Sequence, residues 1–161
     1  MKKVAVYAGS FDPVTYGHVD IIERAARIFD HVIVAVAHNT QKKPIFGVGE
    51  RVSMLEKATK HIPNIEIDDF NGLAVDYVMK KKTNVLIRGL RMVSDFEYEF
   101  QMALTNRKIN DKVETIFLMP SESYSYLSST LLKEAAILGA DLKSFVPDFI
   151  EKELKKKLKR K

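Results

Sequence analysis

The chain has 161 residues, of which 46% are hydrophobic and 29% are charged. This length and composition predict one domain with a sizeable core, and the absence of cysteine excludes disulfides, thiolate chemistry and cysteine-based metal sites. No apolar run approaches the roughly 18 residues that a membrane span needs, so we expect a cytoplasmic protein without a membrane partner.

Apolar runs alternate with helical patterns along the chain. The apolar runs predict strands at residues 4–8, 32–37, 65–70, 85–87 and 113–119. Helical spacing predicts helices at residues 18–29, 50–61, 73–82, 95–108, 129–138 and 147–159, with a long polar loop at 38–49. Strands that alternate with helices form βαβ units. The sequence therefore predicts an α/β fold over residues 1–161, a doubly wound five-stranded parallel sheet of Rossmann-like type.

The net charge of +5 is confined to the C-terminal end of the chain. Residues 151–161 hold seven of the 26 basic and two of the 21 acidic side chains, so the other 150 residues hold 19 of each sign. A balanced globular part does not favour nucleic-acid binding. We interpret the basic stretch at about 147–161 as a solvated helical end, whose lysines suit the C-terminus of a helix. An RNA-binding protein that uses this tail is the alternative.

Residues that follow the predicted strands share a chemistry. In open α/β sheets, ligands bind outside the carboxyl ends of the strands. In chain order these positions hold Gly9, Ser10 and His18; His38, Lys42 and Lys43; Asn71, Gly72 and Leu73; Arg88, Gly89 and Arg91; and the serine-rich stretch 120–130. Glycines, cations and hydroxyls at one edge predict a polyanionic ligand such as a nucleotide phosphate chain.

The stretch GSFDPVTYGH at residues 9–18 carries a histidine where a strand gives way to a helix. Gly9 lets the backbone turn closely, and His18 falls in the first helical turn, where free N–H groups attract anions. His18 is thus a candidate donor to phosphate oxygens. The alternative is a histidine that only caps the helix or faces solvent. The stretch is neither a G-x-G-x-x-G motif nor a P-loop.

Three further stretches have both a functional and a structural interpretation. The two arginines of RGLR at 88–91 offer planar donor forks suited to phosphates, or else pair with Asp95, Glu97 or Glu99. The hydroxyls of YSYLSST at 124–130 either hold a phosphate or cap a helix, and the two roles are compatible. Lys42 and Lys43 suit a phosphate contact or a plain surface.

The remaining histidines point to no metal site. His31, His38 and His61 have no second ligand at metal spacing, which favours structural or surface roles. The chain also contains no G-x-S-x-G elbow, which argues against acyl-enzyme chemistry.

Several motifs together resemble a known family. TYGH at 15–18 and LSST at 127–130 resemble the two signatures of the nucleotidyltransferase superfamily, TxGH and ISST. YAGSFDPVTYGH at 7–18, KKP at 42–44, IRGLR at 87–91, DFEYE at 95–99 and FLMPS at 117–121 together resemble the bacterial phosphopantetheine adenylyltransferases, nearly to residue 150. The resemblance implies transfer of the adenylyl group of ATP to 4′-phosphopantetheine by direct in-line attack, which gives dephospho-coenzyme A and pyrophosphate in the penultimate step of coenzyme A synthesis.

The resemblance also implies residue roles. It gives catalytic roles to His18, Ser10, Lys42 and Arg91, with His18 stabilising charge on the α-phosphate. The implied ATP-binding residues are Gly9, Ser10, Phe11, His18, Gly89, Leu90, Arg91, Glu99, Tyr124, Ser125, Tyr126, Leu127, Ser128, Ser129 and Thr130. The implied acceptor-binding residues are Ser10, Lys42, Leu73, Ala74, Arg88, Met102 and Asn106.

Partners follow from the same resemblance. Mg²⁺ is expected to arrive with ATP rather than in a carboxylate cage, coenzyme A is expected as a feedback inhibitor, and a homohexamer is expected. Ala8, Tyr16 and Ala74 depart from the usual pattern without removing a proposed charged group. The alternatives are another transferase of the superfamily, acting on nicotinamide mononucleotide or glycerol phosphate, and a non-catalytic nucleotide-sensing module; IRGLR with DFEYE argues against the two other transferases.

Overall fold

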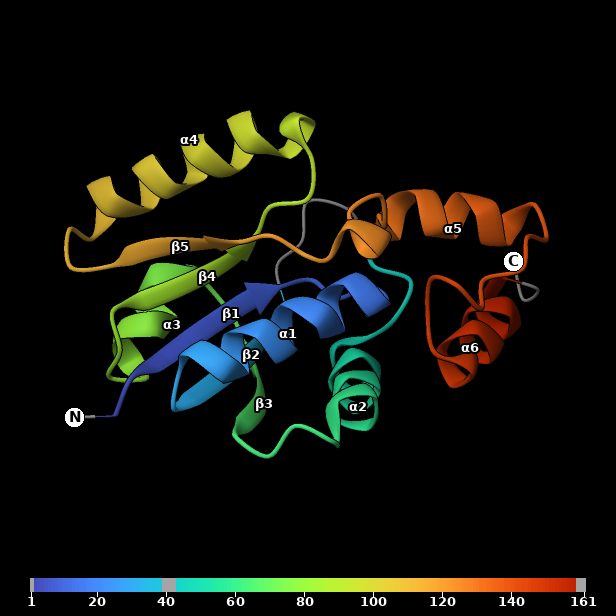
Figure 1. Cartoon of the computed structure of the whole chain (residues 1–161), viewed down its shortest axis with the longest axis horizontal. Coiled ribbons are helices and arrows are strands. Elements are labelled where there is room, and N and C mark those ends of the chain that lie inside the picture. Colours follow the sequence, from blue (N-terminus) through green and yellow to red (C-terminus); the bar gives the residue numbers. More distant parts are fainter. Residues whose placement is uncertain (1, 39–42, 159–161) are drawn as a thin grey trace.

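The computed structural model describes residues 2–38 and 43–158 (Figure 1). The strands are β1 (Val4–Gly9), β2 (His31–Ala37), β3 (Ile65–Phe70), β4 (Val85–Gly89) and β5 (Glu114–Leu118). The α-helices are α1 (Tyr16–Ile28), α2 (Val48–Thr59), α3 (Ala74–Lys80), α4 (Val93–Ile109), α5 (Ser129–Ile137) and α6 (Asp148–Leu158). Every predicted strand and helix is present, and one 3₁₀ turn, η1 (Glu122–Tyr124), was not predicted.

The five strands form a parallel sheet in the order β3-β2-β1-β4-β5. The chain builds β1, β2 and β3 towards one edge and then returns to place β4 on the other side of β1. Strand order therefore reverses between β1 and β4, where Val6 lies opposite Leu86. This confirms the doubly wound parallel sheet, and the carboxyl ends of β1 and β4 form its switch point.

Side chains alternate between the two faces of the central strand and supply two separate cores. Ala5 and Tyr7 pack into the larger core with residues of α1, α2, α5 and α6. Val6 and Ala8 pack into the smaller core with residues of α3. The near-continuous apolar run of β1 is thus explained by burial on both faces.

Local capping sets the helix boundaries that the hydrophobic pattern placed only approximately. Helix α1 begins at Tyr16, two residues before the predicted start, because Thr15 caps it. Helix α2 begins at Val48, since Glu50 accepts a hydrogen bond from the Gly47 N–H at 2.8 Å. Among the described residues, no helix is both long and apolar enough to cross a membrane.

Candidate active site

Two adjoining cavities lie at the carboxyl ends of β1 and β4. The first has a volume of about 260 Å³ and extends towards α1 and the start of α5. The second has a volume of about 470 Å³ and extends towards the ends of β2 and β3. Their shared walls are Ala8, Gly9, Ser10, Arg88, Ser129 and Thr130. Two ligands seated in these cavities would meet over Ser10 and Arg88.

Most of the residues predicted to bind ATP gather around the first cavity. Its walls include Gly9, Ser10, Phe11, His18, Gly89, Arg91, Glu99, Leu127, Ser128, Ser129 and Thr130. Leu90 and Ser125 instead line a neighbouring apolar cavity beside α4. Tyr124 and Tyr126 line neither of the two adjoining cavities, and the role predicted for them stays a prediction.

Of the residues predicted to bind the acceptor, some line the second cavity and others do not. Ser10, Ala74 and Arg88 line the second cavity, together with Lys43. Leu73, Met102 and Asn106 do not line it, and their roles stay predictions. Lys42 lies outside the described residues.

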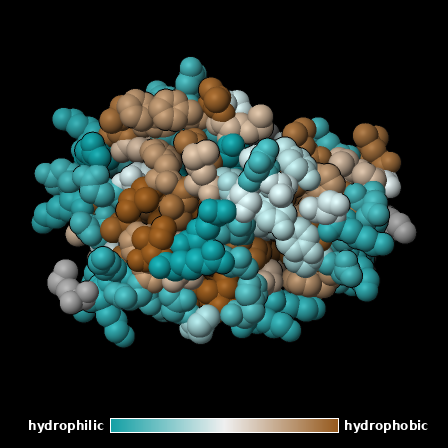
Figure 2. Space-filling view, viewed as in Figure 1, coloured by the Kyte–Doolittle hydropathy of each residue, from teal (hydrophilic) through white to brown (hydrophobic). Residues whose placement is uncertain are grey.

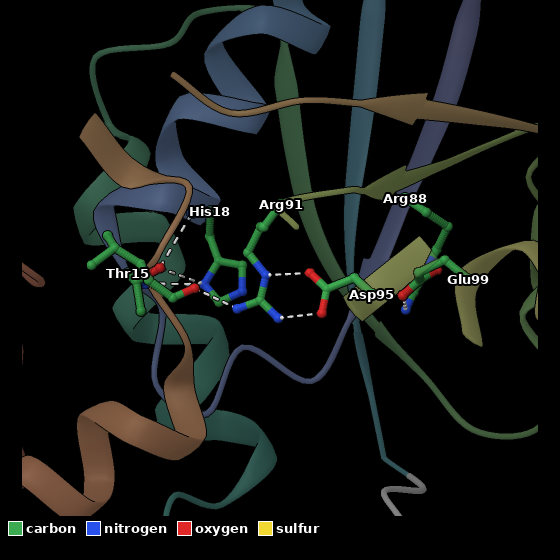
Figure 3. Close-up of polar contacts among 7 residues, drawn as sticks. Thr15, His18, Arg88, Arg91, Asp95 and Glu99 are labelled. Atoms are coloured by element: carbon green, nitrogen blue, oxygen red, sulfur yellow. Dashed lines mark hydrogen bonds and ion pairs between the residues drawn. The ribbon is translucent and has the colours of Figure 1, made fainter. Parts of the chain in front are cut away.

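His18 both caps α1 and lines the first cavity. The His18 N–H donates to the Thr15 hydroxyl at 3.3 Å, and the Thr15 N–H donates to the His18 Nδ1 at 3.0 Å. Figure 3 shows this reciprocal pair beside Arg91. His18 therefore caps the helix, as the alternative supposed, but it also has a place in the cavity wall.

The cap fixes the tautomer of the His18 ring. A backbone N–H can only donate, so Nδ1 is an acceptor and the neutral ring carries its proton on Nε2. Burial lowers the pKa of His18 to about 3, and the positive charges of Arg91 and Arg88 add to this effect. His18 therefore offers the cavity a neutral N–H donor at physiological pH.

Arg88 is held in a partly buried ion pair. Its Nε and Nη2 donate to the two carboxylate oxygens of Glu99 at 2.9 and 2.7 Å, and its Nη1 donates to the Ala8 carbonyl at 2.7 Å. Three of the five N–H groups of the guanidinium are thus used, which leaves two for a ligand. Arg88 thus makes the ion pair that the structural alternative predicted, with Glu99 (Figure 3). The pair orients the fork at the wall that the two cavities share.

Arg91 links α4 to the serine-rich loop. Its Nε donates to Asp95 at 3.1 Å, and its Nη1 donates to the Leu127 carbonyl. In that loop, Ser128 is the N-cap residue of α5 but makes no capping hydrogen bond through its side chain, whereas the Ser129 hydroxyl donates to the Pro13 carbonyl at 3.1 Å. The Ser128 hydroxyl lines the first cavity without that structural task.

Asp12 and Arg51 are important residues that the sequence analysis missed. The buried Asp12 carboxylate accepts from the Ile45 N–H at 3.0 Å, the Phe46 N–H at 2.9 Å and Lys133 at 3.1 Å. Arg51 is 1% exposed and donates to the carbonyls of Ser10, Ala37 and Phe46 at 2.7, 3.1 and 3.1 Å. Together they hold the loop after β1 against the segment that follows Lys42.

Asp20 anchors the start of the serine-rich loop. It accepts from the Ser121 N–H at 2.7 Å, the Ser121 hydroxyl at 2.8 Å and Arg24 at 2.9 Å. Burial alone would raise the pKa of Asp20, but the hydrogen bonds from Ser121 and Arg24 outweigh burial and lower the pKa. The carboxylate stays ionised and ties this loop to α1.

The remaining histidines lie on the surface in pairs with carboxylates. His31 pairs with Glu66 at 3.6 Å, His38 with Asp69 at 2.5 Å and His61 with Glu23 at 2.7 Å. Each of these histidines pairs with one carboxylate, which agrees with the structural interpretation.

Replacement of Arg51 by Lys tests the role of its three hydrogen bonds. A lysine has no planar fork and cannot reach three divergent carbonyls, so buried oxygens lose their donors. We expect a cost of about 1–3 kcal/mol in the free energy of unfolding, or a melting temperature lower by roughly 2–12 °C. Thermal unfolding measures this effect. The matched variant Arg27→Lys, at an exposed arginine of α1, should melt like the wild type. Equal melting of all three proteins would contradict the role of Arg51.

The fold and the site define a class of protein, which comparisons with known proteins make specific. Residues 6–135 match the family model described as cytidylyltransferase-like, the class of nucleotidyltransferases. The putative nicotinate-nucleotide adenylyltransferase of Vibrio parahaemolyticus has the same fold, with a TM-score of 0.70 at 20% identity over 100% of this chain and 97% of that one.

Two relatives are much closer in sequence. Over 158 residues the chain is 57% identical to the phosphopantetheine adenylyltransferase of Caldanaerobacter subterraneus subsp. tengcongensis, covering 98% of this chain and 99% of the relative. It is 54% identical to the phosphopantetheine adenylyltransferase of Carboxydothermus hydrogenoformans, covering 98% of both chains. The chain belongs to the phosphopantetheine adenylyltransferase family.

Proposed function

We propose that the protein transfers the adenylyl group of ATP to 4′-phosphopantetheine, which gives dephospho-coenzyme A and pyrophosphate. The observation that carries this proposal is the pair of cavities that meet at Ser10 and Arg88, with the neutral His18 donor in the wall of the first. The first cavity would hold ATP, and the second would hold the acceptor. The names of the relatives supply the identity of the acceptor.

The mechanism proposed is direct displacement at phosphorus. A phosphate oxygen of the acceptor attacks the α-phosphorus of ATP and forms a new P–O bond, while the bond to the β-phosphate bridging oxygen breaks and pyrophosphate leaves. The His18 Nε2–H would donate to an α-phosphoryl oxygen, where negative charge grows in the transition state. Arg88 and Arg91 would bind and orient the phosphates. The chain supplies position and charge, and needs no covalent intermediate.

Mg²⁺ would enter with ATP. Within residues 2–38 and 43–158, no group of three His, Asp or Glu side chains is arranged to hold a metal ion. Glu99, which lines the first cavity, is already paired with Arg88, and Asp95 is paired with Arg91. The ion would therefore be held by the phosphates of ATP.

The proposal has a direct test that separates it from its alternatives. Pyrophosphate release is measured with ATP, Mg²⁺ and one of three acceptors: 4′-phosphopantetheine, nicotinamide mononucleotide or glycerol 3-phosphate. We expect release with 4′-phosphopantetheine alone, with dephospho-coenzyme A as the second product. Release with another acceptor would overturn the substrate, and no release with any acceptor would favour a nucleotide-sensing module. Neutralising the basic side chains of residues 151–161 tests the RNA-binding alternative, because lost RNA binding would favour it and unchanged turnover would count against it.

Assembly into a homohexamer is part of the proposal, and α4 supports it. This helix exposes Val93, Phe96, Phe100 and Leu104, and the rings of Phe96 and Phe100 stack at 5.5 Å. Figure 2 shows apolar side chains over α4, at the top of the view. A contiguous apolar helix face is typical of a surface that another protein covers, and a second copy of this chain would cover it here.

The assembly prediction is tested at Phe96 and Phe100. Glutamate at both positions would place charge in the middle of the apolar face, so we expect light scattering to show a smaller species than the wild type. The matched variant Ile28→Glu changes an equally exposed apolar residue on α1 and should not alter the mass. An unchanged mass for the double variant would remove α4 from the interface.

The other partners of the proposal follow from its chemistry. Coenzyme A contains both an adenine nucleotide and a pantetheine arm, so it would fill both cavities and act as an inhibitor. Phosphorylated substrates of this kind are made and used inside the cell, which makes the cytoplasm the proposed location. One domain over residues 1–161 would carry the whole site.

A further inference from the structure

Tyr7 is a buried tyrosine whose side chain faces the first cavity. It lies on β1 on the side of the sheet that α1 covers, and only 6% of it is exposed. It lines the first cavity and not the second. The Phe11 ring packs edge-on against the Tyr7 ring, with 5.3 Å between the ring centroids.

The Tyr7 hydroxyl makes no hydrogen bond with any residue of 2–38 or 43–158. Fully enclosed polar side-chain atoms in these ranges all have partners, so the Tyr7 hydroxyl is open to the cavity rather than sealed in the core. The hydroxyl oxygen lies beside Gly89, the last residue of β4, at 3.5 Å from the position that a Cβ would take there. It therefore lies at the carboxyl end of β4. A hydroxyl in a cavity wall that has no partner among these residues is free to bind a ligand in that cavity.

The surroundings keep this hydroxyl a donor. Burial raises the pKa of Tyr7 to about 12, although the charges of Arg88 and Arg91 act in the opposite direction. The proton therefore stays on the oxygen throughout the physiological range. A neutral O–H beside two guanidinium groups matches a ligand oxygen that carries negative charge.

We propose that Tyr7 is a further substrate-binding residue, whose hydroxyl donates a hydrogen bond to an oxygen of the nucleoside triphosphate in the first cavity. This inference rests on the proposed function for the identity of the ligand. It goes beyond that function, because Tyr7 opens the stretch 7–18 that carries the family resemblance but was given no role in it. Since Tyr7 is absent from the walls of the second cavity, its effect is specific to the nucleotide.

Replacement of Tyr7 by Phe removes the hydroxyl and keeps the ring in its packing. A hydrogen bond to a charged oxygen is lost, so we expect kcat/KM for ATP to fall roughly tenfold to a hundredfold. The KM for 4′-phosphopantetheine should stay within about twofold, and the melting temperature should not fall. An unchanged kcat/KM for ATP, or a loss confined to the acceptor, would overturn the proposal.

Tyr77→Phe is the matched control. The Tyr77 hydroxyl donates to Asp68 at 2.6 Å, and Tyr77 lines neither of the two cavities. This variant should lose stability and keep the wild-type kinetic constants, the reverse of Tyr7→Phe.

Calorimetric titration with ATP separates this inference from the proposed function. If the wild type binds ATP but transfers nothing to 4′-phosphopantetheine, the proposed function fails. The ATP dissociation constants of the wild type and of Tyr7→Phe then still test whether the Tyr7 hydroxyl contacts the nucleotide. A weaker constant for Tyr7→Phe then supports the hydroxyl contact, and equal constants refute it. If the wild type transfers the adenylyl group and Tyr7→Phe is unimpaired, only the inference about Tyr7 fails. A wild type that does not bind ATP would overturn both.

Discussion

Replacement of His18 by Ala should lower kcat about 10²–10³-fold, the loss usual when one donor to a transition-state oxyanion is removed. The KM for ATP should change by no more than about threefold, because the contact is strongest where charge develops on the α-phosphate. Steady-state kinetics with both substrates varied measures the two effects separately. A His18→Ala enzyme with normal kcat would end the catalytic assignment of this residue.

Two companion variants serve as references for His18→Ala. His18→Gln keeps an N–H donor of similar reach and should recover part of the lost kcat. His61→Ala removes a surface histidine that pairs with Glu23, and should behave like the wild type.

The pH dependence provides a second check on His18. With a pKa of about 3, its ring stays neutral from pH 5 to 8, so kcat should show no step near 6.5 from this group. In the unfolded chain the ring binds a proton below 6.5, whereas the folded protein does not until about 3. The unfolded state therefore binds more protons in this window, and the contribution of His18 to stability decreases as the pH falls through it. Denaturant unfolding of wild type and His18→Gln at pH 5 and pH 7 should show the steeper loss in the wild type.

Replacement of Arg88 by Ala should lower both the affinity for the acceptor and the stability of the fold. Loss of the guanidinium removes the two N–H groups that face the cavities, so the KM for 4′-phosphopantetheine should rise at least about tenfold. It also leaves Glu99 buried without its partner, which typically costs about 3–5 kcal/mol in the free energy of unfolding. Initial rates with the acceptor varied, and urea unfolding, measure the two losses.

A double variant distinguishes these two losses. Arg88→Met with Glu99→Gln removes both charges, so it should regain much of the stability and still bind the acceptor weakly. Glu99→Gln alone serves as its reference. Arg107→Ala breaks the exposed pair with Glu114 and should change neither property measurably. If only the affinity for ATP fell in Arg88→Ala, the assignment of the two substrates to the two cavities would be wrong.

The fold was predictable because its signals are local. The apolar runs gave all five strands, and their alternation with helices gave the parallel sheet. Sequence periodicity missed η1, a single 3₁₀ turn too short for any period to register. It placed the start of α1 at His18 instead of Tyr16, because the cap depends on Thr15 and on a side chain three residues further on.

The candidate site was predictable only where a residue belongs to a motif. His18 follows β1, Arg88 lies near the end of β4 and the serine-rich loop follows β5, and the structure brings them to one pair of cavities. Arg51 reaches Ser10 from 41 positions away, and Ser121 reaches Asp20 from 101 positions away. Nothing in the local sequence records such contacts, since they exist only once the sheet has formed.

The carboxylates that pair with cations of the two cavities affect the release of pyrophosphate. Glu99, Asp95 and Asp12 each balance a cation of the cavities, namely Arg88, Arg91 and Lys133. Unpaired cations at these positions would hold pyrophosphate tightly and slow its departure. With part of the charge of Arg88 and Arg91 already neutralised, pyrophosphate that leaves the first cavity competes with Glu99 and Asp95 for the two guanidinium groups. The ion pairs therefore lower the affinity for bound pyrophosphate and speed its release, which favours repeated turnover.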